Sequence, residues 1–217
     1  MKNAYEQDSL LWRILNTLAD VMIMTLLWLV FCIPLVTIGA STAALYTCVF
    51  RYRRGEGVRF IREFWEAFRS NFKQATALWG IVVALLATAV ADVWLIFFTA
   101  FEPGTIAKMM MLTAVFVILM VITYVFPLQA YFVNTVGRTM KNAALMALMY
   151  LPVSVVILLL NLVPVAMWLL MPEIFTRTLF LWTALGGGGI AYICGGMFQR
   201  IFQRHEPEKE EETEETE

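Results

Sequence analysis

The sequence contains few charged residues for its length. Only 15% of its 217 residues are charged, against about 25% in a typical soluble domain, while 60% are hydrophobic. A soluble chain of this size has too little polar surface to cover so many apolar side chains. The composition therefore excludes a soluble domain, a nucleic-acid-binding domain and a disordered chain, and it indicates an integral membrane protein.

Histidine and cysteine are also scarce. The single histidine, His205, precedes a glutamate-rich C-terminal end. This position excludes a histidine-liganded metal site or a Ser–His catalytic pair inside the membrane. Cys32, Cys48 and Cys194 are far apart and each lies in an apolar run, which predicts buried hydrophobic side chains. We therefore expect no enzyme activity, no metal and no cofactor.

The sequence instead contains a series of long uncharged runs. Such runs are typical of helices that cross the ~30 Å hydrocarbon core of a bilayer. We predict an all-α polytopic transmembrane helix bundle over residues 1–204, and a disordered acidic tail at 205–217 that contains eight glutamates. The predicted membrane segments are 10–33, 41–52, 75–101, 109–137, 142–171 and 178–198.

The number of crossings depends on residues 21–50, which contain no charge. One helix of this length would span about 45 Å, more than a membrane core requires. Pro34 removes a helical hydrogen bond and Gly39 offers a turn, which favours a hairpin with six membrane segments and a cytoplasmic N-terminus. A single crossing would give five segments and an outer N-terminus. Residues 41–52 are short enough to form a half-helix packed inside the bundle.

An amphipathic helix is predicted over residues 58–72. Apolar side chains occupy one arc of this helix and charged side chains the other. The pattern is typical of a helix in the membrane interface, and equally of a helix that caps the cytoplasmic end of the bundle. The apolar arc consists of Phe60, Ile61, Phe64, Trp65, Phe68 and Phe72.

Positive charge is distributed unequally among the loops. Residues 51–73 contain seven positive residues and 138–141 form a short basic loop, whereas 102–108 and 173–177 contain one positive residue each. Cytoplasmic loops are enriched in Lys and Arg. We therefore predict that the first two loops and the C-terminus are cytoplasmic.

Charged side chains inside the predicted segments are the sharpest candidate sites. A carboxylate there costs several kcal/mol unless it is paired, protonated or hydrated. Arg13, Asn16 and Asp20 share one helix face and are interpreted as a polar stripe near the interface. Asp92 lies about 15 Å deep and has no partner within its own helix. Pairing with Arg13 is favoured, and cation binding or a proton path are the alternatives.

Two further sets of residues are candidates. Pro127 frees a backbone carbonyl, and the polar side chains around it could line a cavity or form interhelical hydrogen bonds, of which the second is favoured. The last segment contains small residues at intervals of four, which favours close helix packing over a flexible hinge. The polar set is Tyr124, Gln129, Tyr131 and Asn134, and the small set is Gly187, Ala191 and Gly195.

Three stretches of the chain carry a family resemblance. They are Ile33–Tyr46 (IPLVTIGASTAALY), Phe64–Trp79 (FWEAFRSNFKQATALW) and Tyr124–Pro152 (YVFPLQAYFVNTVGRTMKNAALMALMYLP). Together they resemble the YesL-like family of bacterial integral membrane proteins, whose function is largely unknown. Thr37–Ser41 and Asn71–Thr76 are the most specific pieces.

The resemblance implies a cellular context. Members often occur beside genes for carbohydrate ABC transporters and their sensor kinases, which implies an accessory or regulatory role in carbohydrate transport at the bacterial cell membrane. The alternative is a small secondary transporter that uses Asp20, Asp92 and proline-broken helices. The expected partners are the lipid bilayer and such a transporter or kinase, with no nucleic acid and with the oligomeric state left open.

Overall fold

The computed structural model describes residues 2–57, 59–98 and 104–205, and these residues form helices without a strand. The predicted all-α polytopic bundle is therefore confirmed. The acidic tail lies outside the described residues, apart from His205. In chain order the elements are α1 (Lys2–Cys32), η1 (Leu35–Thr37), α2 (Ile38–Arg53), α3 (Phe60–Phe98), α4 (Thr105–Tyr131), α5 (Val136–Met149), α6 (Leu151–Leu170), α7 (Pro172–Arg177), α8 (Leu179–Leu181), η2 (Trp182–Gly186) and α9 (Gly187–Gln203).

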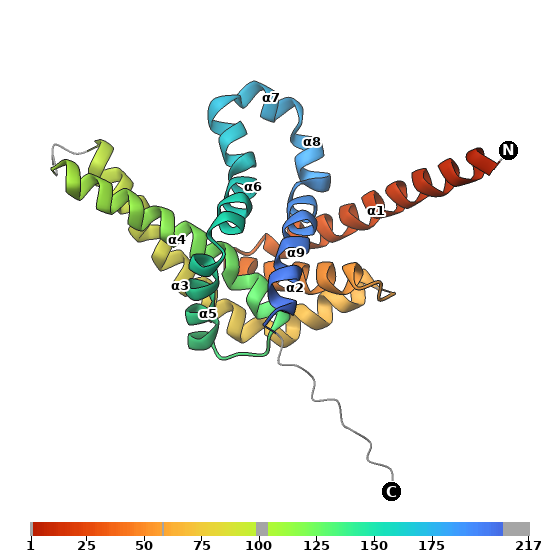
Figure 1. Ribbon diagram of the computed structural model, residues 1–217, viewed down its shortest axis with the longest axis horizontal. Helices are drawn as coiled ribbons and strands as arrows, with labels where there is room; N and C mark the ends of the chain where they lie inside the picture. Colours follow the sequence, from red (N-terminus) through yellow and green to blue (C-terminus); the bar gives the residue numbers. More distant parts are fainter. Residues whose placement is uncertain (1, 58, 99–103, 206–217) are drawn as a thin grey trace, which may run out of the picture.

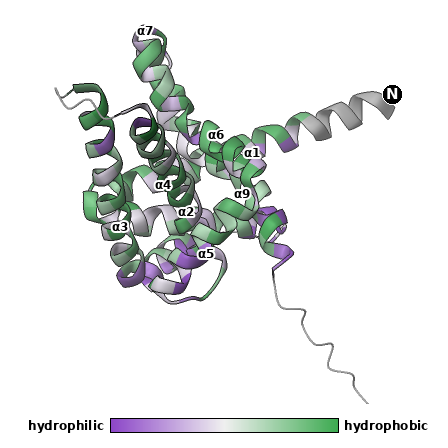
Figure 2. Ribbon diagram, turned by 60° about the vertical axis from the view of Figure 1, so that its left-hand side comes forward, coloured by the Kyte–Doolittle hydropathy of each residue, from purple (hydrophilic) through white to green (hydrophobic). Residues whose placement is uncertain are grey.

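Long helices leave a common centre in three directions. The α3–α4 hairpin and the N-terminal half of α1 extend to opposite sides, and α6 and α9 rise between them, joined by α7 and α8 (Figure 1). Hydrophilic residues gather near α5, whereas the long helices are mainly hydrophobic (Figure 2). Within the described residues, five helical segments are long and apolar enough to cross a membrane: Leu11–Cys32, Phe60–Phe98, Thr105–Tyr131, Leu151–Leu170 and Leu179–Gln203.

The first two helices form an antiparallel hairpin. The Ser41 hydroxyl donates a hydrogen bond of 2.9 Å to the Trp28 carbonyl oxygen near the turn, and the Tyr52 hydroxyl lies 3.3 Å from that of Thr17 further away. Helix α2 has only 16 residues, or about 24 Å, and it is not among the five membrane-crossing candidates. The hairpin and the buried short helix are thus both present, and five long apolar helices are found in the part of the chain that the structure describes.

Helix α3 differs from its predicted form. We expected an interfacial helix at 58–72 and a separate membrane segment at 75–101, but one helix of 39 residues covers Phe60–Phe98. Residues between the two predicted elements include no proline or glycine. Continuing a helix adds a backbone hydrogen bond with each residue, whereas starting a new helix requires a costly nucleus. The amphipathic half and the membrane half therefore form one continuous helix.

Helices α4, α5 and α6 divide the predicted segments 109–137 and 142–171 at different points. Helix α4 contains Pro127 and still continues to Tyr131, after which Phe132 is extended. A second break occurs at Tyr150, directly before the helix that has Pro152 in its first turn. Proline is tolerated in a first turn because the backbone N–H there has no helical partner. Pro152 therefore marks a helix start, and the predicted segment 142–171 consists of two helices.

The predicted segment 178–198 is also composite. It begins with the short helix α8, passes through a π-helical turn at η2 and continues as α9 to Gln203. A π turn leaves some backbone groups without their usual helical partners and is often found at functional sites. This irregular turn lies directly before the glycine-rich start of α9.

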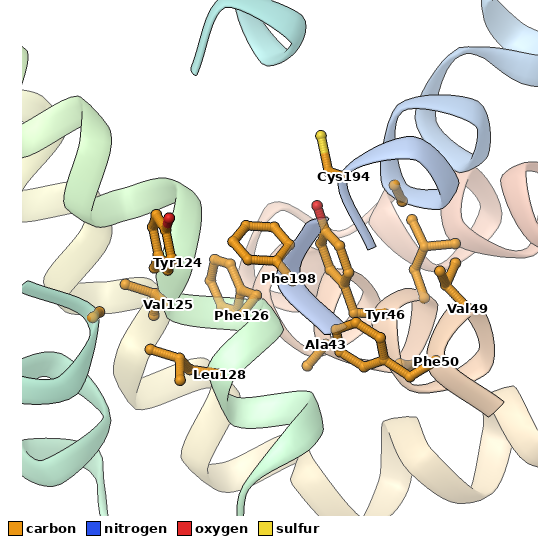
Figure 3. Packing of buried hydrophobic residues seen from close by; sticks show 14 of the residues in the cluster. Ala43, Tyr46, Val49, Phe50, Tyr124, Val125, Phe126, Leu128, Cys194 and Phe198 are labelled. Carbon is orange, nitrogen blue, oxygen red and sulfur yellow. The ribbon is translucent and has the colours of Figure 1, made fainter. Parts of the chain in front are cut away.

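The core of the molecule surrounds α2. Ten of the residues of this helix are buried, and the Phe50 ring packs against Tyr131 of α4 and Phe202 of α9 at centroid distances of 5.3 and 6.2 Å. Figure 3 shows Tyr46 and Phe198 in the same cluster. A short helix enclosed by longer ones can contribute almost its whole surface to packing.

Candidate functional site

Tyr124 connects α4 to the break between α5 and α6. Its side chain is fully buried, and its hydroxyl lies 2.8 Å from the Ser154 hydroxyl. Ser154 in turn donates to the carbonyl oxygens of Ala147 and Tyr150, each at 2.9 Å. These carbonyls lie where the helix is interrupted. The contacts thus form an interhelical hydrogen-bond network, which is the interpretation favoured from the sequence for this residue.

Gln129 is buried without a hydrogen-bond partner among the described residues. Its side chain is 5% exposed, and neither its amide nitrogen nor its amide oxygen is paired. The buried hydroxyl of Thr76 on α3 is unpaired as well. An unpaired buried polar group costs about 1–3 kcal/mol. Gln129 was a candidate from the sequence, but Thr76 was not. Nothing in the sequence around Thr76 indicates that its hydroxyl is buried.

The other two polar residues near Pro127 have structural contacts. The backbone oxygen of Asn134 accepts a hydrogen bond from the Gln74 amide of α3. The Tyr131 ring packs against Phe202 at 5.1 Å. The structure therefore brings the four predicted residues to one end of α4, but each has a different neighbour and they do not form a single site.

The predicted stripe on α1 is exposed at one end. Arg13 and Asn16 are exposed, and Asp20 is half-buried. Asp20 lies near enough to the Tyr52 hydroxyl to interact with it electrostatically, and Thr17 hydrogen-bonds the same hydroxyl. The stripe thus begins against α2 and continues onto a surface that no other described residue covers.

The predicted ion pair between Arg13 and Asp92 does not form. Arg13 lies in the N-terminal half of α1 and Asp92 in the C-terminal half of α3, and these two halves extend to opposite sides of the molecule (Figure 1). The ion pairs among the described residues are Arg51–Glu63, Arg54–Glu56 and Arg62–Glu66, at 3.2, 2.6 and 2.8 Å. The position of a residue within a membrane helix indicates its depth in the bilayer, but it does not determine which other helix lies beside it.

Some side chains of the apolar arc at the start of α3 are buried, and others are exposed. Phe64 and Phe68 are buried, with Phe31 of α1 at centroid distances of 5.3 and 4.9 Å. Ile61 and Trp65 are exposed. This half of α3 therefore caps the bundle with one edge and presents an apolar edge outward. The remaining members of the arc are Phe60, which is half-buried, and Phe72, which is exposed.

Glycines of α9 allow α1 and α2 to approach closely. A Cβ atom at Gly187 would lie 2.7 Å from the Trp28 ring, and one at Gly195 would lie 2.6 Å from the Val49 side chain. Ala191, between them, is buried. The sequence did not single out Gly188, whose backbone N–H donates a hydrogen bond of 3.1 Å to the Thr25 hydroxyl of α1.

A cavity of about 310 Å³ lies beside this packing face. Its walls come from α1, α2, α6, α7, η2 and α9, and they include the side chains of Trp28, Tyr46, Asn161 and Trp182. Pro164 of α6 also borders it. No charged side chain lines the cavity, and within the part of the chain that the structure describes no group of three or more His, Cys, Asp or Glu could hold a metal ion.

One family model matches the chain. It is described as a protein of unknown function, DUF624, and it matches residues 21–93. The matched part comprises the C-terminal part of α1 from residue 21 onward, all of α2 and most of α3. No curated protein and no solved structure matches the chain.

Two sequence pieces within the matched part meet in the structure. Gly39 lies in the piece Thr37–Ser41, and a Cβ atom there would be 2.7 Å from the backbone oxygen of Ala75, which lies in the piece Asn71–Thr76. The matched residues thus include a close contact between α2 and α3.

Proposed function

We propose that this protein is a noncatalytic accessory component of the bacterial cytoplasmic membrane that works with a carbohydrate ABC importer or with the sensor kinase that regulates it. The resemblance to YesL-like proteins suggests this context, and the match over residues 21–93 supports the resemblance. In the proposed orientation the basic end of the molecule and the C-terminus face the cytoplasm.

The surface of α1 is the observation that carries the proposal. Leu11 to Cys32 is apolar enough to cross a membrane, yet Arg13 and Asn16 are exposed on it and have no ion pair or hydrogen bond with another described residue. Polar side chains in a membrane helix usually face a protein neighbour, because lipid offers no hydrogen-bond partners. This part of α1 is therefore suited to bind a membrane helix of another protein.

The start of α3 offers a second contact surface. Its charged face contains an exposed Arg62–Glu66 pair, and its apolar edge exposes Ile61 and Trp65. Both features lie on the part of α3 that we propose to be cytoplasmic. A partner that contacts α1 in the membrane could contact this edge at the membrane surface.

The experiment is site-specific photocrosslinking from position 16 in intact cells, followed by identification of the crosslinked protein. We expect an importer permease or a sensor kinase, and we expect the Arg13→Leu/Asn16→Leu double variant to lose copurification of that protein. The control is Thr113→Leu, a polar-to-apolar change on an exposed face of α4. Crosslinks to lipid alone, or to a second copy of this chain alone, would contradict the proposal.

A small secondary transporter is the alternative, and the unpaired polar groups favour it. Asp92 has no ion pair among the described residues, and Gln129 is buried and unpaired. However, neither Asp20 nor Asp92 lines the 310 Å³ cavity. Loss of a proton- or cation-coupled uptake phenotype in Asp92→Asn, with normal folded yield, would support transport.

A further inference from the structure

The cavity between α1, α2, α6 and α9 has the size and walls of a small-molecule site. Its volume of about 310 Å³ is at the lower end of the range for ligand pockets, about 300–1,000 Å³. Two indole rings, those of Trp28 and Trp182, contribute to its walls. Apolar pockets with a few oriented polar groups are the usual form of such sites.

Two polar groups at this cavity are free to bind a ligand. Tyr46 is 7% exposed, and its hydroxyl makes no hydrogen bond with a described residue. Figure 3 shows this hydroxyl pointing away from Phe50 and toward Cys194. Asn161 donates from its amide nitrogen to the Ile157 carbonyl at 2.8 Å and to the Cys194 sulfur at 3.8 Å, which leaves its amide oxygen as an acceptor. The site thus offers one donor and one acceptor.

Two further polar groups of the cavity, the Thr42 hydroxyl and the Trp28 indole N–H, are paired with each other. The Thr42 hydroxyl donates to the Ile38 carbonyl at 2.7 Å and accepts the Trp28 indole N–H at 3.2 Å. No charged side chain lines the cavity. A sugar would leave most of its hydroxyls unpaired there, and an ion would be uncompensated, which is costly in both cases. An apolar molecule with a single hydroxyl can satisfy both free groups, because a hydroxyl both donates and accepts.

An apolar groove adjoins this cavity on the outer side of α9. The groove has a volume of about 380 Å³ and shares Trp182, Gly186 and Ile190 with the cavity. It also includes Leu181, which is 56% exposed. Because Leu181 belongs to an apolar membrane-crossing segment, this exposed end faces the region where lipid chains lie. A hydrocarbon chain could therefore extend from the cavity into the bilayer.

We propose that the cavity binds an uncharged lipid with one hydroxyl group, such as a long-chain alcohol or a diacylglycerol, drawn from the bilayer. The hydroxyl pairs with Tyr46 and Asn161, and the hydrocarbon chain passes Trp182 into the groove. This binding requires no other protein, and its test is independent of the accessory role proposed above.

The test uses a hexadecanol that carries a diazirine and an alkyne, photolysed with the purified full chain in phosphatidylcholine nanodiscs. We expect saturable labelling in α2, α6 and α9, with oleyl alcohol and dioleoylglycerol as competitors and oleic acid as a much weaker one. Tyr46→Phe should weaken competition by oleyl alcohol about 2- to 10-fold, the value of one hydrogen bond. Its hydroxyl has no hydrogen-bond partner among the described residues, so the variant should fold normally.

A matched pair of variants separates cavity binding from general lipid contact. Ile190→Phe enlarges a side chain that lines both spaces, and Ile193→Phe makes the same change on the same helix at a position that is 52% exposed. Labelling should fall several-fold only in Ile190→Phe. Labelling that does not saturate, that falls equally in both variants, or that methyl glucoside displaces would overturn the proposal.

Discussion

Gly39 is a position where a single added carbon should destabilise the protein. A Cβ atom at Gly39 would lie 2.7 Å from the Ala75 backbone oxygen, 2.8 Å from the Trp79 Cβ and 2.9 Å from the Phe126 ring. These contacts involve both α3 and α4, and two of the three atoms cannot move without their backbone. Gly39→Ala should therefore destabilise the protein by about 2–3 kcal/mol, near the upper end of typical overpacking costs.

Gly80→Ala on α3 is the matched control, because a Cβ atom there has no neighbour within 4 Å. Alanine is the better helix former, so this variant should gain roughly 0.5–1 kcal/mol. Thermal unfolding of both variants in one mild detergent measures the difference. For a chain of this size we expect Gly39→Ala to lower Tm by about 5–10 °C. A Gly39→Ala protein as stable as the parent would show that α2 does not approach α3 this closely.

Two other predictions concern buried polar groups, and a third concerns the proposed orientation in the membrane. Gln129→Met should raise the unfolding temperature in detergent, because it removes a buried amide that has no partner among the described residues and costs about 1–3 kcal/mol; a decrease would show that the amide is bonded in the membrane. Thr25→Val should lower the same temperature by leaving the buried Gly188 N–H unpaired, whereas Thr113→Val should not. Gly57→Cys should resist a membrane-impermeant thiol reagent in intact cells and react after permeabilisation, and labelling of intact cells would reverse the proposed orientation.

Much of the fold could be predicted because membrane helices must be long and apolar. The uncharged runs indicated the membrane helices, and Pro34 and Gly39 indicated the α1–α2 hairpin. Helix boundaries were less predictable. Proline marks a lost hydrogen bond, but Pro127 lies inside α4, while Pro152 begins a new helix. The difference depends on tertiary packing, which one sequence does not display.

The candidate sites were predictable only in part. Asp92 could be recognised as unusual from its depth, but its neighbours depend on how the helices splay, and the expected contact with Arg13 is not formed. The cavity had no sequence signal as a whole, because its walls come from six elements. The Tyr46 hydroxyl and the Asn161 amide oxygen can be recognised as free only when the hydrogen bonds around them are known.

The continuity of α3 gives the molecule a mechanical property. Its 39 residues extend about 58 Å, nearly twice the thickness of a ~30 Å hydrocarbon core, and they include no proline. The half that packs against Phe31 and the half that pairs with α4 therefore turn and tilt as one body. A partner that moved Trp65 at one end would act on Asp92 at the other through a helix that continues without a break between them. Helix α3 can thus transmit motion between its amphipathic start and its membrane segment.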